Sequence, residues 1–135
     1  MEPAAPLRLS SLHPAGRVAE LGLLGRMDTA LLNKGLDFAM EFGANWLRPI
    51  RERLAARFPG LSKAELDEYD RLCREAMNFG HTQLVSCWRE AHSEQRQAFE
   101  FFRRDVVGHY PWVSDANISH LFSQSCYFAF KDGEL

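Results

Sequence analysis

The feature that most constrains the fold is a helical pattern of apolar residues between Ser62 and Tyr110. When each residue advances by about 100°, one side of this stretch is apolar for nearly its whole length. The residues on that side are Leu66, Cys73, Met77, Leu84, Trp88, Ala91, Phe99, Phe102 and Val106. Because charged residues occupy the opposite side, the pattern predicts one long amphipathic helix against which the rest of the chain folds.

The ends of this helix are marked by recognisable signals. Ser62 followed by Glu65 matches a capping box, in which each residue satisfies a backbone N–H of the other. Pro111 cannot continue a helix comfortably, so the helix should end just before it. Gly80 is the weak point of the stretch, but the apolar pattern stays in phase across it. We therefore expect one helix over 62–110, with a bend, if any, near Gly80.

A second helix is predicted to begin at Asp28 or Thr29 and to run to about residue 58. Its apolar side comprises Leu31, Leu32, Phe38, Phe42, Trp46, Ile50 and Leu54. Pro49 lies inside the pattern and removes one backbone hydrogen bond. Because the pattern resumes in phase after the proline, it favours a kink at Pro49 over a separate helix.

A third helix should begin at Ser114 or Asp115 and end near Phe130. It is apolar on more than one side, which is typical of a helix that is buried on several faces. The predicted fold class is therefore all-α, a bundle of three long helices in a single domain over 27–135. Residues 1–26 contain prolines and glycines and no sustained periodicity, so we expect a largely irregular, flexible N-terminal arm.

Composition narrows the function classes. The chain of 135 residues has 16 basic and 18 acidic residues, and this balance argues against a general nucleic-acid-binding protein. No run of about 20 apolar residues is present, so no membrane span is expected. The three cysteines are odd in number and far apart, and no signal peptide is expected, since no basic region followed by an apolar block begins the sequence. Both features favour reduced thiols in a cytoplasmic protein.

A polar group on the apolar side of the long helix is the best candidate for a binding site. His81, His92 and Gln95 lie close to the line that runs through Trp88. One interpretation is that the histidines are structural and hydrogen-bonded to a neighbouring helix. The other is that His81, Trp88, His92 and Gln95 line a pocket for a small apolar ligand. The two histidines are about 16 Å apart along a helix, too far to bind one metal ion together.

Motifs for catalysis or for a cofactor are missing from the sequence. It has no Cys-x-x-Cys, no His-Glu-x-x-His and no glycine-rich phosphate loop after a strand. We therefore expect no metal and no cofactor. The pattern favours a non-enzymatic protein.

Two sets of residues suggest contacts with another molecule. Gly35, Ala39 and Gly43 are spaced four apart, which lets another helix approach closely, either inside the subunit or across a homodimer interface. Phe101 and Phe128 point away from the neighbouring aromatic residues and need a second surface to cover them.

The sequence therefore favours an interaction or regulatory protein that forms a homodimer through aromatic helix faces. The alternatives are a small-ligand-binding bundle and an amphipathic protein that coats a surface.

Overall fold

The computed structural model describes residues 27–46 and 48–135, and all the regular secondary structure in this part of the chain is helical. Five α-helices and one short 3₁₀ helix are present there, so the predicted all-α class is confirmed. The elements are α2 (Thr29–Ala39), η1 (Gly43–Asn45), α3 (Arg51–Arg57), α4 (Lys63–Glu90), α5 (Gln95–His109) and α6 (Asp115–Lys131). The arm predicted for residues 1–26 lies outside the described residues.

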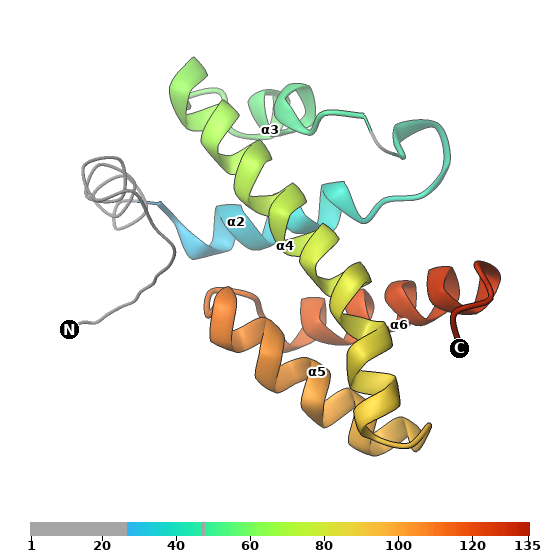
Figure 1. Cartoon of the computed structure of the whole chain (residues 1–135). Coiled ribbons are helices and arrows are strands. Elements are labelled where there is room, and N and C mark those ends of the chain that lie inside the picture. The colour runs from blue at the N-terminus through green and yellow to red at the C-terminus, as the bar shows by residue number, and fades with distance from the viewer. Residues whose placement is uncertain (1–26, 47) are drawn as a thin grey trace.

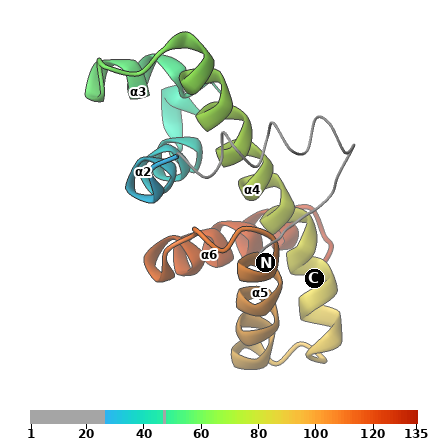
Figure 2. The same ribbon diagram turned by 90° about the vertical axis from the view of Figure 1, so that its left-hand side faces the viewer.

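Helix α4 is the central element of the fold. It contacts each of the other four described α-helices. Figures 1 and 2 show α2 and α3 beside its N-terminal half, and α5 and α6 beside its C-terminal half. The capping box that begins α4 forms as predicted, because Ser62 Oγ accepts from Glu65 N at 3.1 Å and Glu65 Oε1 accepts from Ser62 N at 2.8 Å. None of the described helices is both long and apolar enough to span a membrane.

The prediction of one helix over 62–110 was wrong, because the chain turns between α4 and α5. His92 and Ser93 have φ values of 51° and 66°, the left-handed region that ends a helix. Their backbone N–H groups donate to Arg89 O and Trp88 O, both at 3.0 Å. These two bonds form a Schellman motif, which satisfies carbonyl groups at the end of α4.

Helix α5 then begins with its own cap. The carboxylate of Glu94 accepts hydrogen bonds from Gln97 N at 2.9 Å and from Arg96 N at 3.3 Å. The turn therefore reverses the chain, and α5 returns along α4 instead of extending it (Figure 2).

Gly80 does not mark the place where the chain turns. It lies inside α4, where Leu121 of α6 approaches the backbone closely. A Cβ atom at Gly80 would lie 2.6 Å from Leu121 Cδ2, far inside normal contact distance. The glycine therefore permits the close crossing of α4 and α6.

The prediction of a single kinked helix over 28–58 was also wrong. Helix α2 ends at Ala39, and Gly43 has a φ of 90°, which a residue with a side chain adopts only with strain. The chain therefore leaves the helix before it reaches Pro49. Helix α3 begins afresh at Arg51, and its first turn is held by Asp70 of α4, whose Oδ1 accepts from Ile50 N at 3.0 Å.

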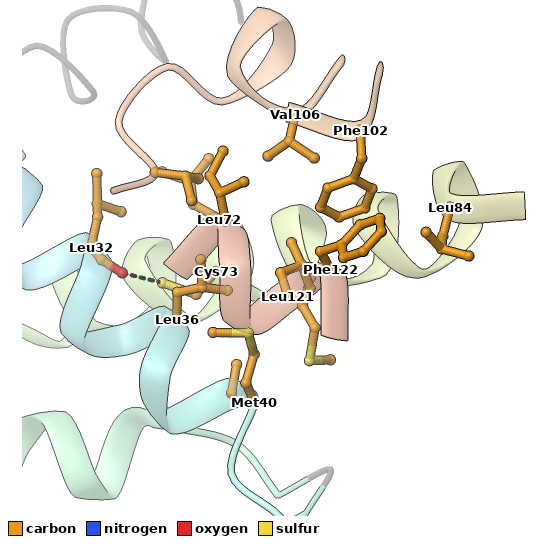
Figure 3. Close-up of a cluster of buried hydrophobic side chains, with 14 of the residues drawn as sticks. Leu32, Leu36, Met40, Leu72, Cys73, Leu84, Phe102, Val106, Leu121 and Phe122 are labelled. Carbon is orange, nitrogen blue, oxygen red and sulfur yellow. Dashed lines mark hydrogen bonds between the residues drawn. The ribbon is translucent and has the colours of Figure 1, made fainter. Parts of the chain in front are cut away.

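The core lies where α2, α4, α5 and α6 meet (Figure 3). The apolar side of the 62–110 pattern is buried in it as predicted, since Met77 and Phe102 are 1% and 0% exposed. Cys73 Sγ donates to Leu32 O at 3.2 Å, and Gly35 leaves the room for this sulfur, because a Cβ there would lie 2.7 Å from it.

Helix α6 is fixed to α2 by a pair of asparagines. Asn33 Oδ1 accepts from Ser114 N at 2.8 Å and from Asn117 Nδ2 at 3.0 Å. Ser114 Oγ also caps α6 by accepting from Asn117 N at 3.2 Å, as the sequence predicted. These bonds set the direction of α6 and therefore the place where its C-terminal end reaches the surface.

Candidate interaction surface

Large apolar side chains are exposed where the loop between α2 and α3 meets the C-terminal end of α6. Phe42 and Tyr127 are each 54% exposed, and Phe130 is 76% exposed. Figure 1 shows the loop and this end of α6 on the same side of the molecule. We call the residues that gather here the aromatic patch, which comprises Phe42, Trp46, His81, Tyr127, Phe128 and Phe130.

Ring contacts join the loop to α6 across the patch. Phe42 meets Trp46 at 5.2 Å between ring centroids, Phe128 at 6.0 Å and Tyr127 at 6.2 Å. Trp46 and Phe128 stack with their centroids 5.5 Å apart and their planes at 19°. Phe130 follows Tyr127 by three residues on α6 and therefore lies on the same side of that helix. Ring contacts therefore connect all the patch residues except Phe130, which is exposed one turn further along α6.

His81 connects the patch to the interior. Its Nε2 lies 2.7 Å from Gln124 Oε1, and Gln124 Nε2 donates to Met40 O at 2.8 Å. Because an amide oxygen can only accept, His81 donates from Nε2. Burial lowers the pKa of His81 below 6.5, although the bond to Gln124 opposes this. The imidazole is therefore neutral at pH 7, and its hydrogen bond to buried Gln124 fixes its position.

An open groove of about 480 Å³ runs beside the patch. Trp46, His81 and Phe128 form its aromatic wall. Asp132 and Glu134, which follow α6, form an acidic edge. The groove is therefore a polar-edged aromatic surface that remains open to solvent, and it differs from the enclosed cavities that bind small molecules.

The structure brings together two residues that the sequence assigned to different roles. His81 was a candidate ligand-binding residue and Phe128 a candidate interface residue, and their rings lie 5.2 Å apart between centroids. The sequence did not assign Phe42 and Trp46 to a site, because both fit the apolar side of a helix over 28–58. Gly43, between them, was the signal that the helix ends before them.

The other predicted pocket residues lie elsewhere. His92 and Gln95 are exposed at the turn between α4 and α5, and Trp88 is half-buried on α4. The expectation that His92 and Gln95 share one helix face with His81 was wrong, because α4 ends at Glu90, whereas Trp88 lies on α4 seven residues after His81. Neither the groove beside the patch nor a second groove of about 240 Å³ near Trp112 is lined by Trp88, His92 or Gln95.

The predicted small-residue stripe is divided between the core and the surface. Gly35 and Ala39 are buried in the core, and Gly35 packs against Cys73 of α4, which agrees with the alternative of close packing inside the subunit. Gly43 is exposed next to Phe42 in the loop that carries the patch. Phe101 is half-buried on α5, where the guanidinium of Arg104 lies 4.7 Å from its ring centroid.

The thiols and the acidic residues of the described part do not form a reactive centre. Burial raises the pKa of Cys87 to about 12, and a hydrogen bond from Sγ to Asp105 at 3.4 Å contributes. Burial likewise raises the pKa values of Cys73 and Cys126. These thiols stay protonated at neutral pH and are poor nucleophiles. Within residues 27–46 and 48–135, no three His, Cys, Asp or Glu residues are grouped so that they could hold a metal ion.

Arg51 and Arg53, two of the arginines that follow Pro49, are paired with neighbouring carboxylates. Arg53 Nη1 lies 2.5 Å from Glu41 Oε1, and Arg51 Nη1 lies 3.5 Å from both Asp67 and Asp70. Positive charge that is paired in this way contributes less to the attraction of phosphate groups.

Comparisons with known protein families, curated proteins and solved structures found no match for this chain. The geometry and chemistry of the surface are therefore the basis for assigning a function.

Proposed function

We propose that the chain is a non-enzymatic interaction protein that binds another protein molecule through the aromatic patch. The observation that carries this proposal is the exposure of Phe42 and Tyr127, whose ring centroids lie 6.2 Å apart, together with exposed Phe130 one turn further along α6, near an open groove. Contiguous exposed aromatic groups are typical of protein-binding sites, because their burial contributes most of the binding free energy.

The surroundings of the patch support a role in binding rather than in folding. The rings of Trp46 and Phe128 are half-buried and held in fixed contact, so little conformational entropy would be lost when a partner covers them. His81 is held by Gln124, which is itself 3% exposed and bonded to Met40 O. A rigid base with exposed rings above it resembles the centre of a protein-binding surface.

Self-association through the same patch is the second candidate. A two-fold dimer uses one surface twice, and Phe130 of each copy would lie against the groove of the other. Because Gly35 and Ala39 are buried inside the chain, the patch replaces them as the proposed homodimer contact. Such a dimer would also bring two copies of Asp132 and Glu134 close together, and this repulsion favours a partner of different sequence.

A site-specific photo-cross-linker tests the proposal. Benzoylphenylalanine is introduced in place of Tyr127, and irradiation in cells that contain the chain should yield a discrete adduct. The same amino acid in place of Gln97, an exposed residue on α5, should yield none. The Phe130→Ser substitution should weaken the adduct formed from position 127. Equal adducts from both positions, or none from position 127, would contradict the proposal.

Sedimentation velocity separates the two candidates. A dimer that forms reversibly and is weakened by Phe130→Ser, but not by Phe101→Ser, would identify a second copy as the partner. A monomer over the whole accessible concentration range would exclude the homodimer.

A further inference from the structure

We propose that the groove beside the aromatic patch takes a segment of a partner protein that presents a Lys or Arg side chain between apolar residues. This inference rests on the proposed function and specifies the chemistry of its partner. It combines three properties of one groove: its charge, its aromatic wall and its open shape.

The charge of the groove is negative. Among the described residues that line it, Asp132 and Glu134 carry charge and none is Lys or Arg. His81 also faces the groove but is neutral at pH 7, since its burial disfavours the imidazolium. A carboxylate pair with no cation in the groove attracts a positive group and repels an acidic one.

The aromatic wall supplies a second attraction for the same group. A Lys or Arg side chain within about 6 Å of an aromatic ring centroid is attracted to the ring face, and Trp is the most favourable residue. Trp46 and Phe128 belong to this wall, and no Lys or Arg of the described residues lines the groove with them. The chain uses the same interaction internally, since the guanidinium of Arg53 lies 5.3 Å from the Phe38 ring centroid.

The shape and the flanking residues favour a protein segment over a small cation. Small-molecule sites enclose most of the ligand surface, whereas this groove is open along one side. Phe42 is exposed and lies 5.2 Å from Trp46 and 6.0 Å from Phe128 between ring centroids, so an apolar side chain next to the cation in the same segment would cover it. A second copy fits less well, because its own Asp132 and Glu134 would meet an edge of like charge.

Three synthetic peptides test the inference. They share the leucine positions of one amphipathic helix and carry Lys, Gln or Glu at all the polar positions. Each is titrated into the isotope-labelled full chain, and binding is followed through the indole N–H of Trp46 and the amide groups of Thr82 and Ala129. The Lys peptide should bind about three- to tenfold more tightly than the Gln peptide, as expected for two partly exposed charge pairs, and the Glu peptide should bind most weakly.

A matched pair of variants separates local charge from net charge. Asp132→Asn combined with Glu134→Gln should remove the preference for the Lys peptide and leave binding of the Gln peptide unchanged. Glu52→Gln combined with Glu100→Gln removes the same net charge from exposed positions outside the groove lining and should keep the preference.

The outcomes distinguish this inference from the proposed function. Equal binding of the three peptides at the groove would overturn the inference but leave the patch as a docking surface. The inference would also be overturned if both double variants lost the preference for the Lys peptide. Chemical-shift changes at residues away from the groove would overturn it as well. The cross-linking experiment at position 127 decides the proposed function independently of these peptides.

Discussion

The two ends of α6 carry similar residues in opposite environments. In its first half, Leu121 is 0% exposed and Phe122 is 6% exposed, and both lie in the core. At its C-terminal end, Tyr127 and Phe130 are 54% and 76% exposed. The difference lies in what the rest of the chain places opposite each end, because both ends belong to one continuous helix.

The buried end is covered because α4 allows a close approach. Gly80 leaves the space that Leu121 fills, and Phe122 meets Phe99 and Phe102 of α5 at 5.1 and 5.4 Å between ring centroids. The exposed end is met by the rings of the loop between α2 and α3, which cover it only in part. The chain therefore has a covered core at one end of α6 and exposed aromatic side chains at the other.

The largest expected effect comes from removing a side chain at the buried end. Leu121→Ala should lower the free energy of unfolding by about 3 kcal/mol, because it leaves a cavity against α4. Phe130→Ala at the exposed end should change it by less than about 0.5 kcal/mol. Urea unfolding followed by circular dichroism measures both values, and similar losses in the two variants would contradict the difference between the two ends.

A smaller loss of stability is expected when a side chain at Gly80 blocks the close approach of Leu121. Gly80→Ala should lower the free energy of unfolding by about 1 kcal/mol, since overpacking against Leu121 outweighs the better helix propensity of alanine. When Leu121→Ala is combined with it, the clash is relieved, and the double variant should lose less than the sum of the single losses. A Gly80→Ala variant more stable than the parent chain would show that Leu121 can move aside.

A substitution at the turn between α4 and α5 should stabilise the fold, in contrast to the two substitutions above. His92 has a left-handed backbone conformation without being a glycine, so His92→Gly should raise the free energy of unfolding by about 0.5–1 kcal/mol. Ser86→Gly, at an exposed position inside α4, is the matched control and should lower it by about 0.5 kcal/mol. If both substitutions were destabilising, the strain assigned to His92 would be refuted.

The smallest expected effect is a pH dependence at the patch. The pKa of His81 in the folded chain is below the ordinary value of 6.5, so the unfolded chain binds the proton more readily. The stability from neutral His81 is therefore complete above pH 6.5 and is lost as the pH falls through 6.5 toward the lowered pKa. Thermal unfolding at a series of pH values should show a weaker acid dependence in His81→Asn than in the parent chain, and identical dependences would rule out this contribution.

Some elements of the fold follow from the sequence because their signals are local. Ser62 and Glu65 begin α4, and Ser114 begins α6, at the residues that capping rules indicate. The turn at His92 could not be predicted in the same way, because its residues do not carry the glycine that normally marks a helix end. The apolar pattern also continued in phase across the turn, because α5 has an apolar side of its own that packs against α4. The pattern therefore gave no sign that the helix ends there.

The candidate surface was only partly predictable for a different reason. Periodicity shows which side of a helix is apolar, but it does not show what covers that side in the folded chain. Phe128 was expected to need a second surface, and the structure places it beside Trp46 and His81. Phe42 and Trp46 could join them only because α2 ends early, which is a property of the loop and not of the apolar pattern.

The most direct test is hydroxyl-radical footprinting of the purified full chain, with and without the Lys peptide. In the free chain, Tyr127 and Phe130 should be oxidised much faster than Phe102, and the peptide should protect the first two while leaving Phe101 unchanged. Slow oxidation of Tyr127 and Phe130 in the free monomer, or no protection by the peptide, would contradict an uncovered aromatic docking surface at the end of α6.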